Sequence, residues 1–205
     1  GVALIFGGRR WKVVDVDEDR NVIHLTAAKG GRPPQFAGAG GIEVHQQVRR
    51  TMLELYENGG RLRYLDPGAQ NLVEQGRGAY HELDLREGKL LSWGSDTLWF
   101  PWIGDRALNA VLLELHSLGL TAGQEGPTLT VQETPIDRLM EIFENLVEGG
   151  FKPAQQAADE LRNLQHEKHH HYLGNELLAA DYASRHLNPS VAERAVGKAV
   201  RPGKL

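Results

Sequence analysis

Cysteine is missing from this chain of 205 residues, and long apolar stretches are missing as well. Without thiols the protein has no disulfide bond, no thiolate zinc site and no cysteine nucleophile. The lack of cysteine fits a reducing compartment, so we expect a cytoplasmic location. Because no apolar run approaches the roughly 20 residues that span a bilayer, we expect no membrane partner. The G-x-x-x-x-G-K-[ST] loop that cradles nucleotide phosphates is also missing.

What is present is ordinary for a globular protein, with 40% hydrophobic and 24% charged residues. The net charge of −4 is spread unevenly along the chain. Residues 1–36 carry +2 and residues 185–205 carry +4, whereas residues 37–132 carry −4 and residues 133–184 carry −6. Since local patches govern phosphate contacts, the basic ends are candidates for binding nucleic acid. The acidic segment is more typical of a solvated or partner-facing surface.

Two runs near the N-terminus, Leu4–Val16 and Asn21–Ala28, tend to alternate apolar and polar residues. This pattern predicts strands of a small sheet. Cations surround one aromatic in the first run and also follow the second run; they are Arg9, Arg10 and Lys12 around Trp11, then Lys29 and Arg32. Basic groups near an aromatic on a small sheet suit a polyanion with stackable bases. The alternative is that they are solubilising charges on an exposed edge strand.

The stretches FGGRRWKVVDVD, VIHLTAAKGGRPPQF and HQQVRRTMLELY resemble a known region of superfamily 2 helicases. That region follows the motor domains in the Lhr-type (large helicase-related) and kindred DEAD/DEAH-box helicases. Three later pieces, LWFPW, DRALNAVL and ELLAADYA, fit a similar downstream pattern. The resemblance runs through much of the chain, and its motifs are structural rather than catalytic.

The resemblance implies a C-terminal accessory region that helps to hold a nucleic-acid strand while ATP hydrolysis moves it. Its partners would be single-stranded or partly duplex nucleic acid and the motor domains of the same polypeptide. ATP and magnesium are implied for those motor domains, and no cofactor is expected in this chain, which has no D-E-x-H-like tetrad. Because Gly1–Phe6 already has a strand pattern and no initiating Met, we expect the C-terminal portion of a longer polypeptide. The residues expected to contact nucleic acid are Arg9, Arg10, Trp11, Lys29, Arg32 and Arg106.

The predicted fold class is α+β: a small antiparallel sheet or partial β-barrel first, then a mixed β-hairpin and helical unit. We expect three parts: a β-rich segment with a helix at 1–60, the mixed unit at 61–188 and a basic tail at 189–205, either a short helix or disordered. Helices are predicted near Ile42–Tyr56, Asp66–Leu83, Asp105–Leu118, from Pro135, from Pro153 and at Leu173–Leu187. Hairpins are predicted for Lys89–Trp93 with Thr97–Trp102, and for Leu120–Gln124 with Thr128–Gln132. The apolar stripe of the first helix is expected to be Val44, Val48, Met52 and Leu55.

Histidines gather at positions 166 and 169–171, and the row His166-Glu167-Lys168-His169-His170 satisfies the H-E-x-x-H pattern. On a helix this spacing suits zinc, with His186, Glu176 or Asp181 as a third ligand, and a His-dependent metal hydrolase is one alternative function. The surroundings are polar, however, and short motifs often match by chance. We therefore favour a solvated His-rich helix and expect no metal site.

Trp93, Trp99 and Trp102 gather with Phe100 in one predicted hairpin. Aromatics at strand spacing bury much area, so we expect core packing here rather than a base-stacking platform. No Ser-His-Asp or paired-carboxylate arrangement stands out, and no catalytic machinery is expected. A further alternative is a protein-interaction module whose acidic helices dock on a motor domain or another protein.

Overall fold

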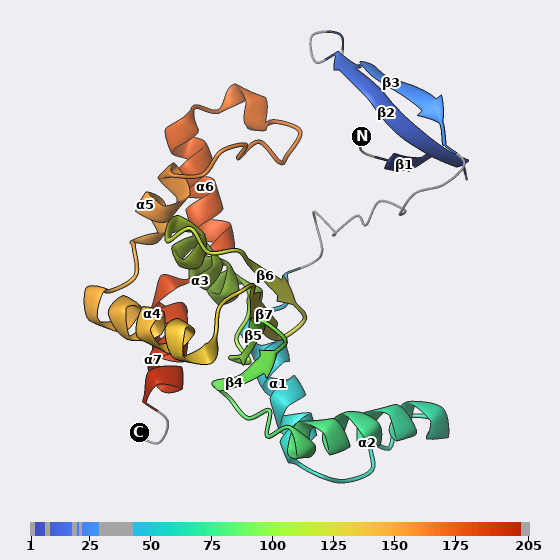
Figure 1. The fold of residues 1–205 in the computed structure, drawn as a ribbon, viewed down its shortest axis with the longest axis vertical. Coiled ribbons are helices and arrows are strands. Elements are labelled where there is room, and N and C mark those ends of the chain that lie inside the picture. The colour runs from blue at the N-terminus through green and yellow to red at the C-terminus, as the bar shows by residue number, and fades with distance from the viewer. Residues whose placement is uncertain (1–2, 7–8, 18–19, 21, 29–42, 202–205) are drawn as a thin grey trace. The chain divides into compact units, whose positions relative to one another are not determined.

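The structure is a computed structural model that describes residues 3–6, 9–17, 20, 22–28 and 43–201. Contacts divide the chain into a first unit, Gly1–Ile42, and a second unit, Glu43–Leu205 (Figure 1). The fold class is α+β, as predicted, because the described residues form two antiparallel sheets and seven α-helices. The boundary lies before the first helix, whereas the sequence-based division placed it after that helix, at residue 60.

The first unit holds a three-stranded antiparallel sheet in the order β1-β2-β3. Its strands are β1 (Ala3–Phe6), β2 (Arg9–Asp17) and β3 (Val22–Ala27). The run at residues 4–16, predicted as one strand, is therefore two strands that pair with each other. Among the described residues the sheet is open, with β1 and β3 at its edges, so the small-sheet alternative is confirmed over the partial barrel.

A bulge in β2 rearranges the faces of this sheet. Val13 lies opposite Leu25 and Asp15 lies opposite His24, so the register shifts between Val13 and Asp15. One extra residue in a strand moves every later side chain to the other face. Asp15 consequently shares a face with Lys12, which lies opposite Thr26.

The second unit contains a four-stranded antiparallel sheet in the order β4-β5-β7-β6. Its strands are β4 (Lys89–Trp93), β5 (Asp96–Phe100), β6 (Ala122–Glu125) and β7 (Thr128–Val131). Both predicted hairpins are confirmed, and they join because β5 pairs with β7. Trp99 of β5 and Leu129 of β7 lie opposite each other at this seam, and both are fully buried.

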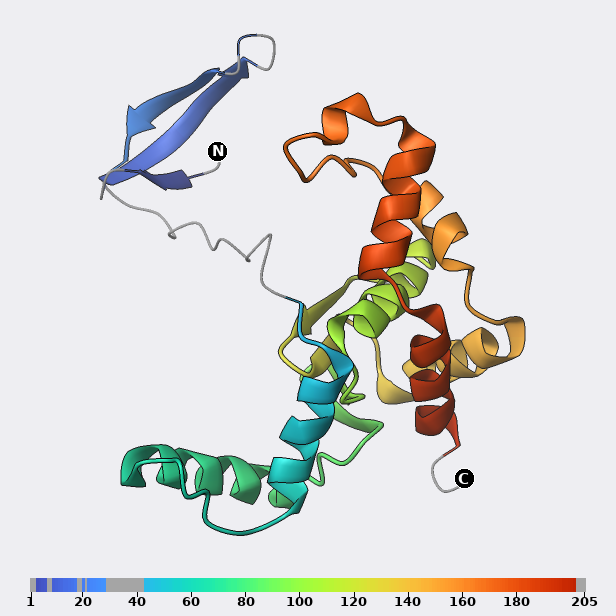
Figure 2. The ribbon, with the colours of Figure 1, turned by 180° about the vertical axis from the view of Figure 1, so that it is seen from behind.

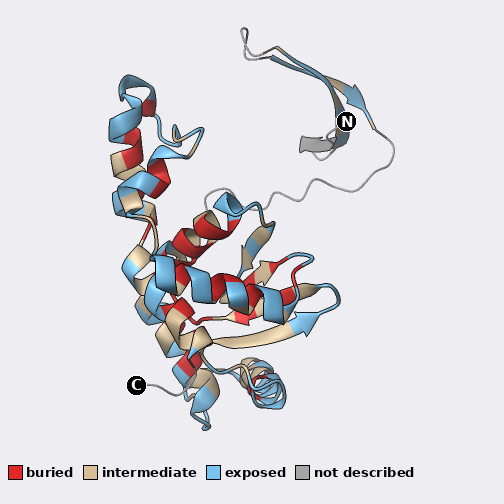
Figure 3. Cartoon of the chain, turned by 60° about the vertical axis from the view of Figure 1, so that its left-hand side comes forward, coloured by how far each residue is buried: buried red, intermediate tan, exposed pale blue. Residues whose placement is uncertain are grey.

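Five helices pack around this sheet and on one another; they are α3 (Asp105–Ser117), α4 (Ile136–Gly149), α5 (Ala154–Asp159), α6 (Asn175–His186) and α7 (Pro189–Val200). Figure 3 shows buried residues along the inner sides of these helices and exposed residues along their outer sides. At the centre of the core, the rings of Trp99 and Phe143 lie 4.9 Å apart, edge to face. None of the described helices combines the length and apolar character needed to cross a membrane.

The segment expected as a basic tail is largely helical, since α7 occupies residues 189–200. Asn188 caps its first turn, with Oδ1 accepting a hydrogen bond from the N–H of Val191 at 3.3 Å, and Pro189 opens the helix. Small apolar side chains of α7 are buried in the core; they are Ala192, Ala195, Val196 and Ala199. The helix alternative is therefore confirmed for residues 189–200.

Two further helices, α1 (Gln46–Glu57) and α2 (Pro67–Glu82), form a helical arm of residues 46–82 that extends from the four-stranded sheet (Figures 1 and 2). A small separate core fills the angle where the arm meets the segment after β5. Its rings are Tyr56, Tyr80 and Trp102, with centroids 5.7 to 6.3 Å apart. The indole N–H of Trp102 donates to the carbonyl of Leu85 at 2.7 Å.

The apolar stripe predicted for α1 is wrong at its centre. Val48 is 51% exposed, whereas Arg49 and Leu53 are buried. The helix turns this face inward because Arg49 forms an ion pair with Asp105 at the start of α3. A charged side chain is buried where a partner compensates its lost hydration, and hydrophobic periodicity alone does not reveal such a partner.

Candidate nucleic-acid contact surfaces

The face of β2 that carries the cations is polar and open. Arg10 and Lys12 are exposed and lie two residues apart on the same strand, so they project on one side of the sheet. Exposed Thr26 of β3 lies directly opposite Lys12 on that face. The strand geometry therefore presents two cations and a hydroxyl side by side.

Trp11 lies on the other face of the sheet. It is half-buried and shares its face with Val13 and Leu25 of the neighbouring strand. The sequence brackets Trp11 with cations, but the alternation of β2 separates the ring from the Arg10 and Lys12 side chains. One face thus carries the two cations and the other carries the aromatic ring.

The bulge adds acidic groups to the cationic face. Asp15 and Asp17 lie beyond Lys12 toward the end of β2, opposite His24 and Val22. The Oδ1 atom of Asp17 accepts a hydrogen bond from the backbone N–H of Arg20 at 3.0 Å. Positive charge is thus concentrated at the end of β2 nearest Arg10.

For three of the residues expected to bind nucleic acid, the structure does not describe the side chain. Lys29 and Arg32 lie outside the described residues, and only the backbone of Arg9 is described, as the first residue of β2. Their contribution remains a prediction from the sequence.

Arg106 of α3 forms hydrogen bonds with the end of another helix. Its Nη2 atom donates to the carbonyl of Ser184 and, at 3.1 Å, to that of Leu187. The last carbonyls of α6 lack intrahelical partners, and Asn109 donates to a third one, that of His186, at 3.2 Å. The side chain is still partly open to solvent, but its guanidinium fastens α6 to α3.

The tryptophans of the β4–β5 region divide between core and surface. Trp99 and Trp102 are buried, as expected for core aromatics, whereas Trp93 at the end of β4 is 71% exposed. The expectation of core packing is therefore wrong for Trp93, which lies opposite Asp96 beside the turn at Gly94 of the hairpin.

The histidine cluster does not lie on an α-helix, so the expected His-rich helix is wrong. Residues 161–169 form turns and extended chain, and His170–Tyr172 is a single 3-10 turn. The i, i+4 spacing of a zinc-binding helix is therefore not realised by His166 and His170. In the part of the chain that the structure describes, no three His, Asp or Glu side chains are placed to hold a metal ion.

His170 is buried and holds its own loop together. Its Nδ1 atom lies 3.1 Å from the carbonyl oxygen of Leu164 and 3.2 Å from the backbone nitrogen of His166. Its Nε2 atom lies 3.7 Å from a carboxylate oxygen of Asp181. These contacts explain why the side chain is buried. Of the suggested third ligands, Asp181 lies near His170, and His186 instead pairs with Glu43.

The side chains of His186 and Glu43 are in close contact. The Nδ1 atom of His186 lies 2.5 Å from an Oε1 oxygen of Glu43. Burial, together with the charge of Glu43, raises the pKa of the nearby Tyr182 phenol above its ordinary value. The pair joins the segment before α1 to the end of α6, beside a cavity of about 140 Å³.

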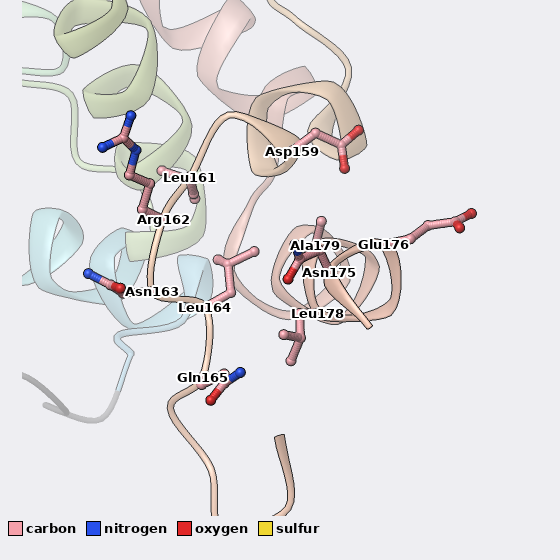
Figure 4. A pocket seen from close by; sticks show the side chains of 10 residues that line it. All are labelled: Asp159, Leu161, Arg162, Asn163, Leu164, Gln165, Asn175, Glu176, Leu178 and Ala179. Atoms are coloured by element: carbon pink, nitrogen blue, oxygen red, sulfur yellow. The ribbon is translucent and has the colours of Figure 1, made fainter. Parts of the chain in front are cut away.

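A cavity of about 690 Å³ lies between the loop after α5 and the start of α6 (Figure 4). Leu164 and Leu178 line its two sides. The charged side chains on its lining are Asp159, Arg162 and Glu176. Two carboxylates against one guanidinium make this cavity a poor site for a phosphate.

The sequence patterns did not predict that two arginines, Arg49 and Arg77, are buried. Arginine is rarely fully buried unless it is paired, and composition does not show the partner. An exposed segment between α1 and α2, Arg61 to Tyr64, was also missed. Its signal was visible, since a double glycine followed by arginines and an aromatic repeats the pattern around Trp11.

No family model, curated protein or solved structure matches this chain.

Proposed function

We propose that this chain is a non-motor accessory region of an ATP-dependent helicase and contacts a nucleic-acid strand. The observation that carries the proposal is the cationic face of β2, where exposed Arg10 and Lys12 lie side by side opposite Thr26. Cations and hydroxyls are the groups that hold phosphates in a protein–nucleic acid interface. Residues 4–56 resemble the region that follows helicase motor domains, and this resemblance is the reason for assigning helicase activity to the longer polypeptide.

The geometry gives this contact a defined form. Arg10 and Lys12 bind phosphates of one strand, and this contact is independent of base sequence. Trp11 lies on the opposite face and does not stack on the bases of that strand. Its ring instead helps to fix β2 against β3, through the face that it shares with Leu25. The motor domains of the same polypeptide are the expected source of ATP hydrolysis.

The test is a titration of a labelled single-stranded oligonucleotide at rising salt. Replacing both Arg10 and Lys12 by Ala is expected to weaken binding and to reduce the log–log salt slope by about 1.4, since each phosphate contact contributes about 0.7. The matched control removes two exposed cations elsewhere, through Arg138→Ala and Lys168→Ala, and is expected to leave the slope unchanged. Equal slopes for the sheet variant and the wild type would reject the contact.

A second function, docking on a motor domain or another protein, is favoured by one surface of α4. Four carboxylates lie on its exposed side at helical spacing; they are Asp137, Glu141, Glu144 and Glu148. Arg138 pairs with Glu141 at 2.8 Å, and the remaining carboxylates face solvent. Measuring binding to purified motor domains, with Glu144→Lys and Glu148→Lys as charge reversals, tests this function separately from oligonucleotide binding.

A further inference from the structure

The segment that joins α1 to α2, residues 58–65, is held in one conformation by side chains of α2. Arg77 is buried, and its guanidinium donates to three carbonyls: Nε to that of Leu55, Nη2 to that of Asn58 and Nη1 to that of Gly60, at 2.8 to 2.9 Å. Gln70 accepts the N–H of Leu62 through Oε1 at 3.0 Å. The segment is thus organised before any partner arrives.

A β-turn forms the exposed tip of this segment. The N–H of Leu65 donates to the carbonyl of Leu62 at 3.1 Å, which places Arg63 and Tyr64 at the two central positions. Side chains at these positions project away from the chain that the turn connects. Directly after the turn, Asp66 caps α2 by accepting the N–H of Ala69 at 2.8 Å. We call residues 61–64 the arginine–tyrosine turn.

The arginine–tyrosine turn displays two cations and one ring. Tyr64 is 75% exposed, and Arg61 and Arg63 are exposed on either side of it. Within the described residues, the side chains of these three residues form no hydrogen bond, ion pair or ring contact. Gly59 and Gly60 precede them, and a Cβ at either glycine would meet nothing within 4 Å, so the approach to the turn is open.

The carboxylates near this segment are Glu54, Glu57, Asp66 and Glu74. The hydroxyl of Tyr80 donates to Glu57 at 3.2 Å, and Glu54 lines a cavity of about 320 Å³ together with Arg61. Asp66 holds the first turn of α2, and Glu74 pairs with Arg77 at 2.6 Å. Residues 58–65 include two arginines and no acidic residue. Among the described residues, Arg61 and Arg63 form no ion pair with any of these carboxylates.

We propose that the arginine–tyrosine turn is a second contact for single-stranded nucleic acid, remote in sequence from β2. Tyr64 stacks on an unpaired base, and Arg61 and Arg63 bind the phosphates on either side of it. The inference rests on the proposed nucleic-acid function and deepens it by adding a site at which an aromatic ring stacks on a base. A polyanion without bases satisfies the arginines but leaves the ring exposed, which is why a nucleic-acid strand fits the turn better than an acidic peptide.

The comparison with Trp93 defines what is specific to this site. Trp93 is 71% exposed and also lies at a turn. Its neighbours Ser92, Gly94 and Ser95 carry no charge, and Asp96 carries a negative one. An exposed ring without cations has no means to hold a phosphate, so Trp93→Ala is the matched control for Tyr64→Ala.

The experiment uses the full chain and three fluorescently labelled probes: a thymidine oligonucleotide, an abasic oligonucleotide of the same length, and polyglutamate. Tyr64→Ala is expected to weaken binding of the thymidine probe at least about fivefold, the low end for loss of one stacked base. It is expected to leave binding of the abasic probe unchanged. Arg61→Ala with Arg63→Ala is expected to weaken both oligonucleotides and to reduce the salt slope by about 1.4.

Each outcome decides between the sites. If Tyr64→Ala and Trp93→Ala have the same effect, the stacking contact is wrong. If the double arginine variant weakens binding of polyglutamate and of the oligonucleotides equally and Tyr64→Ala changes nothing, the turn binds acidic polymers generally and the inference is overturned.

If only the Arg10 and Lys12 variant weakens binding, the sheet contact stands and the turn is rejected. The reverse result rejects the sheet contact alone. A full chain that binds no oligonucleotide rejects both. Unchanged melting temperatures confirm that the variants are folded, as expected for exposed positions.

Discussion

Arg49 of α1 and Asp105 of α3 form a buried ion pair, with the Nη2 and Oδ1 atoms 3.0 Å apart. The same carboxylate accepts the N–H of Val44 at 2.8 Å and a hydrogen bond from Gln124 at 2.7 Å. Three separate elements therefore meet at Asp105. This junction joins the helical arm to the sheet and its helices, and so positions the arginine–tyrosine turn.

Arg49→Ala is expected to lower the free energy of unfolding by about 3 kcal/mol, the low end for removing one partner of a buried pair. The remaining hydrogen bonds to Asp105 are the reason for expecting the low end. Urea denaturation followed by tryptophan fluorescence measures the change. The exposed pair of Arg138 and Glu141 supplies the control, for which Arg138→Ala is expected to cost less than about 1 kcal/mol. Equal costs for the two variants would show that the Arg49 pair contributes no more than a surface pair.

Arg77→Lys is expected to loosen the segment between α1 and α2 while keeping the positive charge. An ammonium lacks the planar fork that reaches the carbonyls of Leu55, Asn58 and Gly60 together. We expect faster amide hydrogen exchange across residues 58–65 and a loss of about 2 kcal/mol in the free energy of unfolding. Arg61→Ala is the control, because its side chain makes no such contact. Unchanged exchange in the Arg77→Lys variant would contradict the anchoring role.

Two glycines of α2 are expected to respond in opposite directions to replacement by alanine. At Gly76 a Cβ would lie 2.8 Å from a ring carbon of Tyr56, which is packed against Tyr80 and Trp102, so Gly76→Ala is expected to be destabilising. At Gly78 a Cβ would meet nothing within 4 Å. Gly78→Ala is expected to stabilise the helix by about 0.5–1 kcal/mol, the general preference for Ala over Gly in helices. Thermal melting of the two variants gives the comparison, and the same sign for both would be contrary to the packing described.

Tyr80 is expected to couple stability to alkaline pH. Burial, together with the charge of Glu57 and a hydrogen bond to it, raises the pKa of the phenol to about 12. The pKa of Tyr80 in the folded chain therefore exceeds its value of 10.0 in the unfolded chain. The contribution of the neutral phenol to the free energy of unfolding is complete below pH 10 and is lost as the pH rises toward 12. Chemical denaturation at a series of alkaline pH values is expected to show a smaller decline for Tyr80→Phe than for the wild type. Parallel declines would indicate that this phenol ionises as readily in the folded chain as in the unfolded one.

Local signals in the sequence determined most of the helices and both hairpins of the second unit. Asp66-Pro67 predicted the start of α2, and the structure shows Asp66 as its cap. The turn at Gly94 predicted the β4–β5 hairpin because glycine takes the positive φ of 64° found there at no steric cost. Caps and turns involve residues close in sequence, so short patterns are sufficient to locate them.

Tertiary structure decided what lies beside what. The alternation of β2 places Trp11 on the opposite face of the sheet from Arg10 and Lys12, and the bulge brings Asp15 onto the face of Lys12. Arg106 was expected at a nucleic-acid surface, and its guanidinium bonds the end of α6, which lies some eighty residues later. Burial of Arg49, the loop around His170 and the pairing of β5 with β7 likewise depend on distant partners. Composition and periodicity describe each segment alone. A charged side chain is buried only where a partner in the folded chain compensates the free energy of its lost hydration, and that partner can be distant in sequence.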